Sequence, residues 1–314
     1  MLKRLSTIIA GAILGLIFLA APVSAKEAPK PAVWLQISPV SNRVSLVPEQ
    51  SLEYNFTVEN IGAEDFSYKI YAGTYTASGE DYNISFTKET KRTQLQRWIK
   101  FKNTDGSWAD HLDLSLAAGK KQVINYQVTV PKDLPAGGQY ATIFAEAEPN
   151  TNGGNTSGIK AISRVGLLVF GSTSGNTRHK AEITDYHLDS FLTKGQISAT
   201  AKVKNSGNTD FATRHKFTVQ SLFGKEIFNK EIVYDVLPAT ERRVRVKWDK
   251  TPHIGIYKVS YKVSALDKKQ SETKIVLIMP VTAIVILLML LTLSIIWIII
   301  LFRKRKQRKS KLIV

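Results

Sequence analysis

Two nine-residue stretches of the sequence follow one pattern. "VENIGAEDF" spans Val58 to Phe66, and "VKNSGNTDF" spans Val203 to Phe211. Each places asparagine two residues after the valine, glycine two residues further on, and an aspartate-phenylalanine pair at its end. Asparagine and glycine favour turns, and glycine supplies a positive φ where a turn requires one. Each stretch therefore predicts a strand that ends near the valine, a turn, and a return strand that begins at the phenylalanine.

The repeat continues beyond both turns. "VPKDLPAGGQYATIFA" and "TPHIGIYKVSYKV" each place a glycine two residues before a tyrosine, at Gly138 and Tyr140 and again at Gly255 and Tyr257. The same features recur in the same order, which indicates that one architectural unit occurs twice in the chain.

Alternating apolar and polar residues dominate the chain between its two ends. "SLEYNFTVEN" and "QVINYQVTVP" are examples, and this alternation is the period of a half-buried strand. Short strands broken by Asn, Gly, Asp and Pro are typical of an antiparallel sandwich. We therefore expect an all-β fold with two tandem Ig-like β-sandwich domains, at residues 32–172 and 178–267, joined by the polar segment "GSTSGNTR".

The first copy of the unit is longer than the second. Fifty positions separate Phe66 from Leu116, whereas 26 separate Phe211 from Leu237. Insertions in a sandwich form surface loops and edges, where binding often resides. Aromatic faces pack against sugar rings or protein partners, although one or both tryptophans of the insertion could instead fill the core. The candidate ligand-binding residues are Tyr75, Tyr82, Arg97, Trp98, Lys100 and Trp108, with Lys91 and Arg92 as further cations for wall anions.

Both ends of the chain carry apolar segments. Residues 1–25 hold two cations, an apolar run and a small-residue site ending at Ala25, which predicts a cleaved signal peptide; a retained anchor is the alternative. Residues 275–302 contain no charge and exceed the ~20 residues needed to cross a ~30 Å hydrocarbon core, so we expect one transmembrane helix. Residues 303–314 carry seven cations and no acid, which predicts a cytoplasmic tail and an extracellular ectodomain.

The net charge of +17 comes largely from the two ends of the chain. Nine of the 43 cations lie in the signal segment and the tail, so 34 cations face 26 acids in the ectodomain. Such an excess suits a protein near a polyanionic wall or membrane surface. The sequence shows neither a helix nor a motif for reading nucleic acid, and we expect no nucleic-acid partner.

The sequence contains no motif for catalysis or for a cofactor. The absence of cysteine excludes disulfides, thiolate metal sites and cysteine nucleophiles. The five histidines form no metal-binding pair, and no phosphate-binding loop, dinucleotide fingerprint or nucleophile elbow occurs. Asp105, Asp110 and Asp113 could hold Ca²⁺, but a solvated turn is the preferred interpretation. We therefore expect a protein that is not an enzyme and has no cofactor and no metal.

The first domain and the overall layout resemble the WxL-interacting protein family of Gram-positive cell surfaces. The resemblance rests on "LQISPVSNRVSLVPEQSLEYNFTVENIGAEDFSYKIYAGTYT", on "RWIKF" followed by "LAAGKKQVINYQVTVPKDLPAGGQYATIFAE", and on "AISRVGLLVFG". The order of signal, two domains, single span and basic tail agrees with it. It implies a first domain that binds peptidoglycan and a second that binds a host or partner protein, and it nominates no catalytic residue.

These observations predict a single-pass protein of the cell membrane whose first domain contacts cell-wall peptidoglycan or wall-associated proteins. The alternative is a surface assembly or adhesion scaffold that binds a secreted protein through strand or loop contacts, for which an unpaired edge at "QVINYQVTV" would serve. An enzyme or a sensor is a third class, and the short tail leaves no room for a signalling domain.

Overall fold

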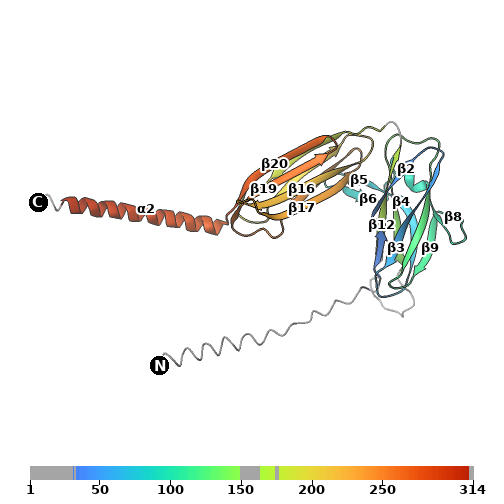
Figure 1. The fold of residues 1–314 in the computed structure, drawn as a ribbon, viewed down its shortest axis with the longest axis horizontal. Helices are drawn as coiled ribbons and strands as arrows, with labels where there is room; N and C mark the ends of the chain where they lie inside the picture. The colour runs from blue at the N-terminus through green and yellow to red at the C-terminus, as the bar shows by residue number, and fades with distance from the viewer. Residues whose placement is uncertain (1–30, 32, 149–162, 174–176, 311–314) are drawn as a thin grey trace, which may run out of the picture.

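A computed structural model describes residues 31, 33–148, 163–173 and 177–310, with only the backbone for 304–310. Figure 1 shows two β-sandwiches that meet at an angle, and helix α2 (Val281–Ser310) that extends from the far end of the second one. The expected all-β fold with two tandem sandwiches and a C-terminal apolar helix is confirmed. The predicted signal peptide, the middle of the predicted linker and the last four residues of the tail lie outside the described residues.

Two five-stranded sheets pack face to face in the first sandwich. The chain enters one sheet as β1 and crosses to the other as β2, which pairs in parallel with β12. Alternate side chains of β3 and β10, among them Phe56 and Tyr126, point into the core between the sheets. The strand orders are β1 (Leu35–Ser38), β3 (Ser51–Asn60), β10 (Lys121–Thr129), β7 (Ile99–Lys102), β8 (Trp108–Ala109), and β2 (Ser41–Leu46), β12 (Ser163–Thr173), β11 (Gln139–Glu148), β4 (Phe66–Thr74), β9 (His111–Leu116).

The second sandwich packs a three-stranded sheet on a five-stranded one. Its core is continuous with aromatic side chains of the first sandwich, so the two domains share buried surface. The strand orders are β13 (Ala181–Leu188), β15 (Ser198–Asn205), β18 (Thr240–Lys247), and β14 (Phe191–Leu192), β20 (Lys268–Ile278), β19 (Gly255–Ala265), β16 (Phe211–Ser221), β17 (Glu226–Val236).

A buried asparagine builds the turn in the first copy of the nine-residue repeat. The Asn60 amide Nδ2 donates to the carbonyl oxygens of Glu64 at 2.8 Å and Leu116 at 3.1 Å, and its Oδ1 accepts from the Gly62 N–H at 3.0 Å. The return strand β4 begins at Phe66, as predicted. The side chain thus closes the turn and ties it to β9, the strand that pairs with β4.

The second copy makes the same three hydrogen bonds. Asn205 donates to the carbonyl oxygens of Thr209 and Val236, each at 2.8 Å, and accepts from the Gly207 N–H at 2.9 Å. Neither Gly62 nor Gly207 has a positive φ, so these turns do not use glycine for the left-handed backbone conformation that the sequence allowed. Gly207 is required for space, because a Cβ there would lie 2.2 Å from the carbonyl oxygen of Arg178.

Space also explains the second repeated feature, glycine before tyrosine. A Cβ on Gly138 would lie 2.0 Å from the Tyr140 hydroxyl oxygen, and a Cβ on Gly255 would lie 2.5 Å from the Tyr257 ring. Residues two apart on a strand share a face, so each tyrosine ring folds back over its glycine. The sequence repeat therefore records two equivalent packing arrangements.

The insertion of the first domain divides into two parts. One part, a hairpin of two short strands, packs against the second sandwich (Figure 1). The other part extends the sheet of β10 with β7 and β8, which confirms that inserted residues form a sheet edge. The parts are β5 (Thr76–Ser78) and β6 (Asn83–Ser85), and then the 3₁₀ helix η1 (Gln94–Arg97) with β7 and β8.

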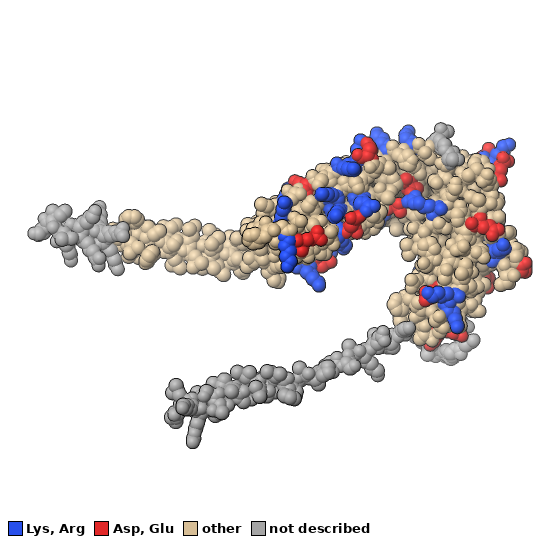
Figure 2. All heavy atoms as spheres, viewed as in Figure 1, with Lys and Arg blue, Asp and Glu red and all other residues tan. Residues whose placement is uncertain are grey.

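The second sandwich extends further, and the helix begins later, than the sequence predicted. Strand β20 runs to Ile278, and its residues Val276 and Ile278 are buried in the core. The predicted domain end at 267 and helix start at 275 are wrong, because a continuous apolar run does not separate a buried strand from a helix. Pro280, which lacks a backbone donor, divides the two elements. The candidate membrane span is Val281–Arg303. Residues 281–302 contain no charged residue, and Figure 2 shows the face of this helix in view without charged side chains.

Candidate functional site

Charged and aromatic side chains join the two sandwiches. Arg43 on β2 donates to the carboxylates of Asp210 at 2.7 Å and Asp235 at 2.5 Å, and its guanidinium lies 4.9 Å from the centre of the Phe170 ring. The Tyr140 hydroxyl donates to Asp210 Oδ1 at 3.0 Å and accepts from the Asp210 N–H at 2.9 Å. The aspartate of the second repeat therefore contacts the first sandwich.

The β5–β6 hairpin holds the second sandwich from the other side. The Tyr82 hydroxyl accepts a hydrogen bond from the Leu237 N–H at 3.0 Å, and the Arg242 guanidinium lies 4.3 Å from the centre of the Tyr82 ring. The Glu80 carbonyl accepts from the Arg243 N–H at 3.0 Å, and the two side chains form an ion pair. These contacts fix the angle between the sandwiches, and with it the shape of the surface between them.

Burial controls protonation at and near this junction. It raises the pKa of Asp235, an effect that the Arg43 guanidinium opposes, and it raises the pKa of the Tyr140 hydroxyl far above the usual range. Burial, assisted by the nearby Arg242 charge, lowers the pKa of His215 to about 4. The histidine is therefore neutral at physiological pH, and the tyrosine acts as a neutral hydrogen-bonding group.

A cleft of about 630 Å³ lies beside the junction. Its walls are apolar and open to solvent, with Val40 74% exposed and Val233 51% exposed. On its floor the Phe144 ring lies 5.2 Å from the Phe86 ring, and the Arg164 guanidinium lies 4.8 Å from the Phe144 ring centre. The cleft thus combines exposed apolar side chains, an aromatic floor, two cations (Arg164 and Arg242) and the Asp235 carboxylate.

One strand along this cleft has an open edge. Strand β12 pairs with β11 from Ser163 to Gly171 but with β2 only from Leu168 onward, so among the described strands nothing pairs with Ser163–Leu167 on that side. The Leu168 N–H donates to the Val40 carbonyl, on the β2 side. Because alternate residues of a strand point their backbone groups to the same side, Arg164 and Gly166 direct N–H and C=O groups into the open edge. A row of unpaired backbone groups is a template for another strand.

The segment "QVINYQVTV", nominated as an unpaired edge, lies in β10 except for its last residue. Strand β10 pairs with β3 over its whole length and with β7 over Tyr126–Val128. That nomination is wrong for the second half of the strand, since the inserted strand β7 covers it. Only Lys121–Asn125 remains open among the described strands, and Val123 in its middle is exposed.

Two of the six nominated ligand-binding residues are buried between the sandwiches. Tyr75 is 3% exposed and Tyr82 is 6% exposed, and both belong to the core of the second domain. The docking of the β5–β6 hairpin explains this burial. Tyr75 also lines the cleft and a smaller hollow at the junction, and contact of either ring with a ligand stays a prediction. Sequence periodicity could not show the burial, because the covering surface belongs to residues far along the chain.

The other four nominated residues lie along the inserted edge. Trp98 is half-buried against the first core, as the core interpretation of this tryptophan predicted. Trp108 is half-buried, with the Lys102 ammonium 5.3 Å from its ring centre. Arg97 pairs with Glu89 at 2.7 Å, and Lys100 pairs with Asp110. The structure does not bring the six residues into one site, and their contact with a ligand stays a prediction.

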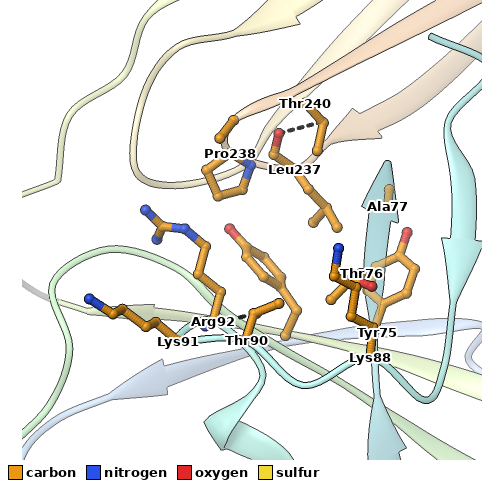
Figure 3. A pocket seen from close by; sticks show the side chains of 12 residues that line it. Tyr75, Thr76, Ala77, Lys88, Thr90, Lys91, Arg92, Leu237, Pro238 and Thr240 are labelled. Carbon is orange, nitrogen blue, oxygen red and sulfur yellow. Dashed lines mark hydrogen bonds between the residues drawn. The ribbon is translucent and has the colours of Figure 1, made fainter. Parts of the chain in front are cut away.

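A smaller hollow of about 350 Å³ lies at the junction and holds both further cations nominated from the sequence (Figure 3). Arg92 points toward Pro238 of the second sandwich, whereas Lys91 points away from it. Arg92 Nη1 donates to the carbonyl oxygen of Asn208 at 2.6 Å. Arg92 therefore helps to hold the two sandwiches together.

Of the residues that line the cleft, the sequence analysis nominated Tyr75 and none of the others. A signal was present in "SRVGLLVFG", because a glycine inside a strand marks a close approach. A Cβ on Gly73 or Gly166 would lie 2.9 Å or 3.3 Å from the Phe144 ring, which rests on both glycines from the strand between them. Phe144 explains why glycine is needed at positions 73 and 166. Recognising this requires the strand order, which the sequence does not show.

Comparison with known proteins gives distant structural likenesses. No family model matches the chain, and no curated protein matches it. The class 5 fimbriae chaperone CfaA is 13% identical, covers 77% of this chain and 99% of its own, and has a TM-score of 0.36. The E. coli chaperone DraB is 13% identical, with coverages of 77% and 97% and a TM-score of 0.36. The Pseudomonas aeruginosa CupB2 chaperone is 13% identical, with coverages of 76% and 98% and a TM-score of 0.33. Likenesses this distant carry no argument about function.

These findings correct the resemblance to the WxL-interacting protein family, which is wrong. No family model supports it, and the three similar solved structures named above are chaperones. The described parts of the segments that suggested it form strands β1–β4, β7 and β10–β12, whose alternating pattern is common to β-sandwiches. The peptidoglycan ligand that the resemblance implied loses its support with it.

Proposed function

We propose that this protein is a membrane-anchored surface protein that binds an extended segment of a secreted protein by strand addition to β12. The observation that carries the proposal is the open edge at Ser163–Leu167, which borders the cleft. An added strand would pair with the outward backbone groups of Arg164 and Gly166. Main-chain hydrogen bonds give such a complex affinity, and pockets for alternate side chains give it specificity.

The cleft is suited to the side chains of such a strand. Arg164, Gly166 and Leu168 point to the cleft side of β12, next to the exposed Val40 and Val233. Apolar side chains of the partner gain by leaving water here, at ~25 cal/mol per Å² of apolar area. The Arg164 guanidinium favours an acidic side chain at one of the alternate positions.

The fixed angle between the sandwiches supports the same function. Val40 and Phe144 come from the first sandwich and Val233 from the second, so the cleft exists only while the domains keep their orientation. The ion pairs of Arg43 with Asp210 and Asp235 hold that orientation in the absence of a partner. A preorganised surface binds more tightly because less freedom is lost on binding.

The apolar helix gives this function a location. Helix α2 is long and apolar enough to span a bilayer over Val281–Arg303. The cations after it favour a cytoplasmic tail, which supports a location of the two sandwiches outside the cell. The role proposed for the sandwiches is binding, and no catalytic step is assigned to them.

Peptide selection on the full-length protein tests the proposal. A phage-displayed library of random peptides is panned against the protein in detergent, and enriched peptides are measured on variants. Arg164→Pro removes the outward N–H at the β12 edge, whereas Arg164→Ala removes the side chain alone. We expect enriched peptides with alternating apolar residues, and we expect Arg164→Pro to weaken binding at least tenfold more than Arg164→Ala does.

A matched substitution on the other open edge separates the two candidate strands. Val123→Pro removes an outward N–H from β10, where Val123 lies between residues unpaired on that side. Binding that survives Val123→Pro and is lost with Arg164→Pro supports the β12 edge. The reverse result, equal effects of the two prolines in folded variants, or no enrichment would refute it.

A further inference from the structure

One end of the second sandwich exposes large apolar side chains. In the turn between β16 and β17, Phe223 is 99% exposed and Leu222 is 55% exposed. Ile254, just before β19, is 61% exposed. Single exposed apolar residues are ordinary on a protein surface. Three of them in neighbouring loops, including a fully exposed aromatic ring, indicate a surface that contacts a membrane or another protein.

The strand register places these loops beside the start of α2. Ser221, the last residue of β16, pairs with Tyr257, which pairs in turn with Val276 of β20. Helix α2 begins at Val281, a few residues after Val276. The β16–β17 turn therefore lies level with the point where the chain enters the helix, as Figure 1 shows.

Lysines surround the apolar side chains at this end. Lys225 lies in the same turn and is exposed. Lys194 and Lys250 are exposed in the neighbouring loops, which the pairing of Ser198 with Lys247 brings to the same end. The acids in the described loops here are Asp189, whose carboxylate accepts from the Ser198 N–H, and Asp249, which pairs with Lys247 at 3.2 Å. Exposed Glu226 follows Lys225 at the start of β17. Apolar tips with flanking cations suit a surface that is apolar inside and anionic outside.

We propose that this end of the second sandwich rests in the outer face of the lipid bilayer. Leu222, Phe223 and Ile254 enter the boundary between headgroups and acyl chains, and the lysines contact anionic headgroups. The inference rests on the membrane anchoring by α2 in the proposed function. The anchor identifies lipid as the partner of these apolar loops, because a helix that spans the bilayer from Val281 brings them to the lipid surface.

The contact has a consequence for the partner-binding cleft. A helix joined through Met279 and Pro280 leaves the sandwiches free to swing about one connection. A second attachment through the β16–β17 turn removes most of that freedom. Because the junction fixes the angle between the sandwiches, the bilayer then fixes the height and direction of the β12 edge above the membrane.

Single-cysteine labelling of the full-length protein tests this, because the chain has no cysteine of its own. Phe223→Cys, Leu266→Cys and Leu288→Cys are each labelled with an environment-sensitive nitrobenzoxadiazole dye and placed in phosphatidylcholine–phosphatidylglycerol vesicles. Leu266 is the matched control, since it is an exposed apolar residue in the turn between β19 and β20. It lies a full strand of β19 away, ~35 Å at ~3.3 Å per residue. Leu288 reports whether α2 is embedded.

We expect blue-shifted emission and protection from aqueous iodide at positions 223 and 288, and solvent-like emission with full quenching at 266. Phe223 is so exposed that its replacement leaves the fold intact. An embedded 288 probe with a 223 probe that behaves like 266 overturns the bilayer contact and leaves the anchor standing. A 288 probe in water overturns the anchor and this inference together, and leaves strand binding at β12 to its own test.

Discussion

Replacing Asn205 by alanine should destabilise the second sandwich by about 3–4 kcal/mol. The side chain is fully buried, and its amide makes three hydrogen bonds, of 2.8, 2.8 and 2.9 Å. Alanine leaves two carbonyl oxygens and one N–H without these partners. Each such group costs about 1 kcal/mol or more when it is buried and unsatisfied.

Amide hydrogen exchange on the full-length protein measures this effect for each sandwich separately. A loss of about 3 kcal/mol lowers the protection of the slowest amides in β15 and β16 by roughly 100-fold, since 1.4 kcal/mol is about tenfold at 25 °C. Amides in β3 and β4 should change much less. Asn60→Ala makes the matched control, because Asn60 forms the same bonds in the first sandwich and should reverse the pattern.

A small effect would refute this reasoning. If Asn205→Ala changed protection in β15 and β16 by less than about threefold, the three bonds would contribute little beyond what water supplies. If Asn205→Ala and Asn60→Ala each destabilised both sandwiches equally, the two domains would unfold as one unit, and the repeat would not act locally.

Two further predictions concern titration and the junction. Burial holds the pKa of His215 at about 4, below its ordinary 6.5, so the unfolded chain binds a proton that the folded chain does not. Stability of the second sandwich should therefore fall as pH drops from about 6.5 to about 4, by about 2 kcal/mol at pH 5, and level off below. The free energy of unfolding in urea, measured at a series of pH values, should fall less in His215→Gln than in the unchanged protein. It should fall as before in His253→Gln, because His253 is exposed. An unchanged fall in His215→Gln would contradict the assignment of this pH dependence to His215. Gly137→Ala places a Cβ 2.1 Å from the carbonyl oxygen of Asn208 and should open the junction, which lowers amide protection there. Gly106 has a similar positive φ, +89° against +96°, but open space around it, so Gly106→Ala should leave the junction closed. Equal effects of the two substitutions would point to backbone strain alone.

Much of the architecture follows from local sequence. Alternation marks the strands, because burial of one face of a sheet requires every second residue to be apolar. The repeated asparagine marks the turns, since its hydrogen bonds reach residues in its own turn, such as Glu64 and Thr209. The apolar helix is visible from its length, although its start is not, because Val276 and Ile278 are as apolar in a buried strand as they would be in a helix.

The functional surface depends on contacts that no local pattern encodes. Tyr75 and Tyr82 read as exposed aromatics of an insertion, and only the docking of their hairpin on the second sandwich buries them. The open edge of β12 depends on where β2 begins to pair, which is set by how the chain crosses between sheets. Nothing in the sequence distinguishes Phe144 from other strand residues. Its role in the cleft follows from the strand order, which places Gly73 and Gly166 on either side of it.

The nine-residue repeat shows the difference between what local sequence determines and what tertiary structure decides. The sequence determined that Asp65 and Asp210 occupy the same place in the same turn, because the residues around each are within nine positions. Tertiary structure decided what each aspartate does. Asp65 accepts the Ala118 N–H at 2.8 Å within its own sandwich, whereas Asp210 binds Arg43 from the other one. The physical reason is range: a turn closes over a few residues, whereas an ion pair across 167 positions exists only once two complete domains have packed together.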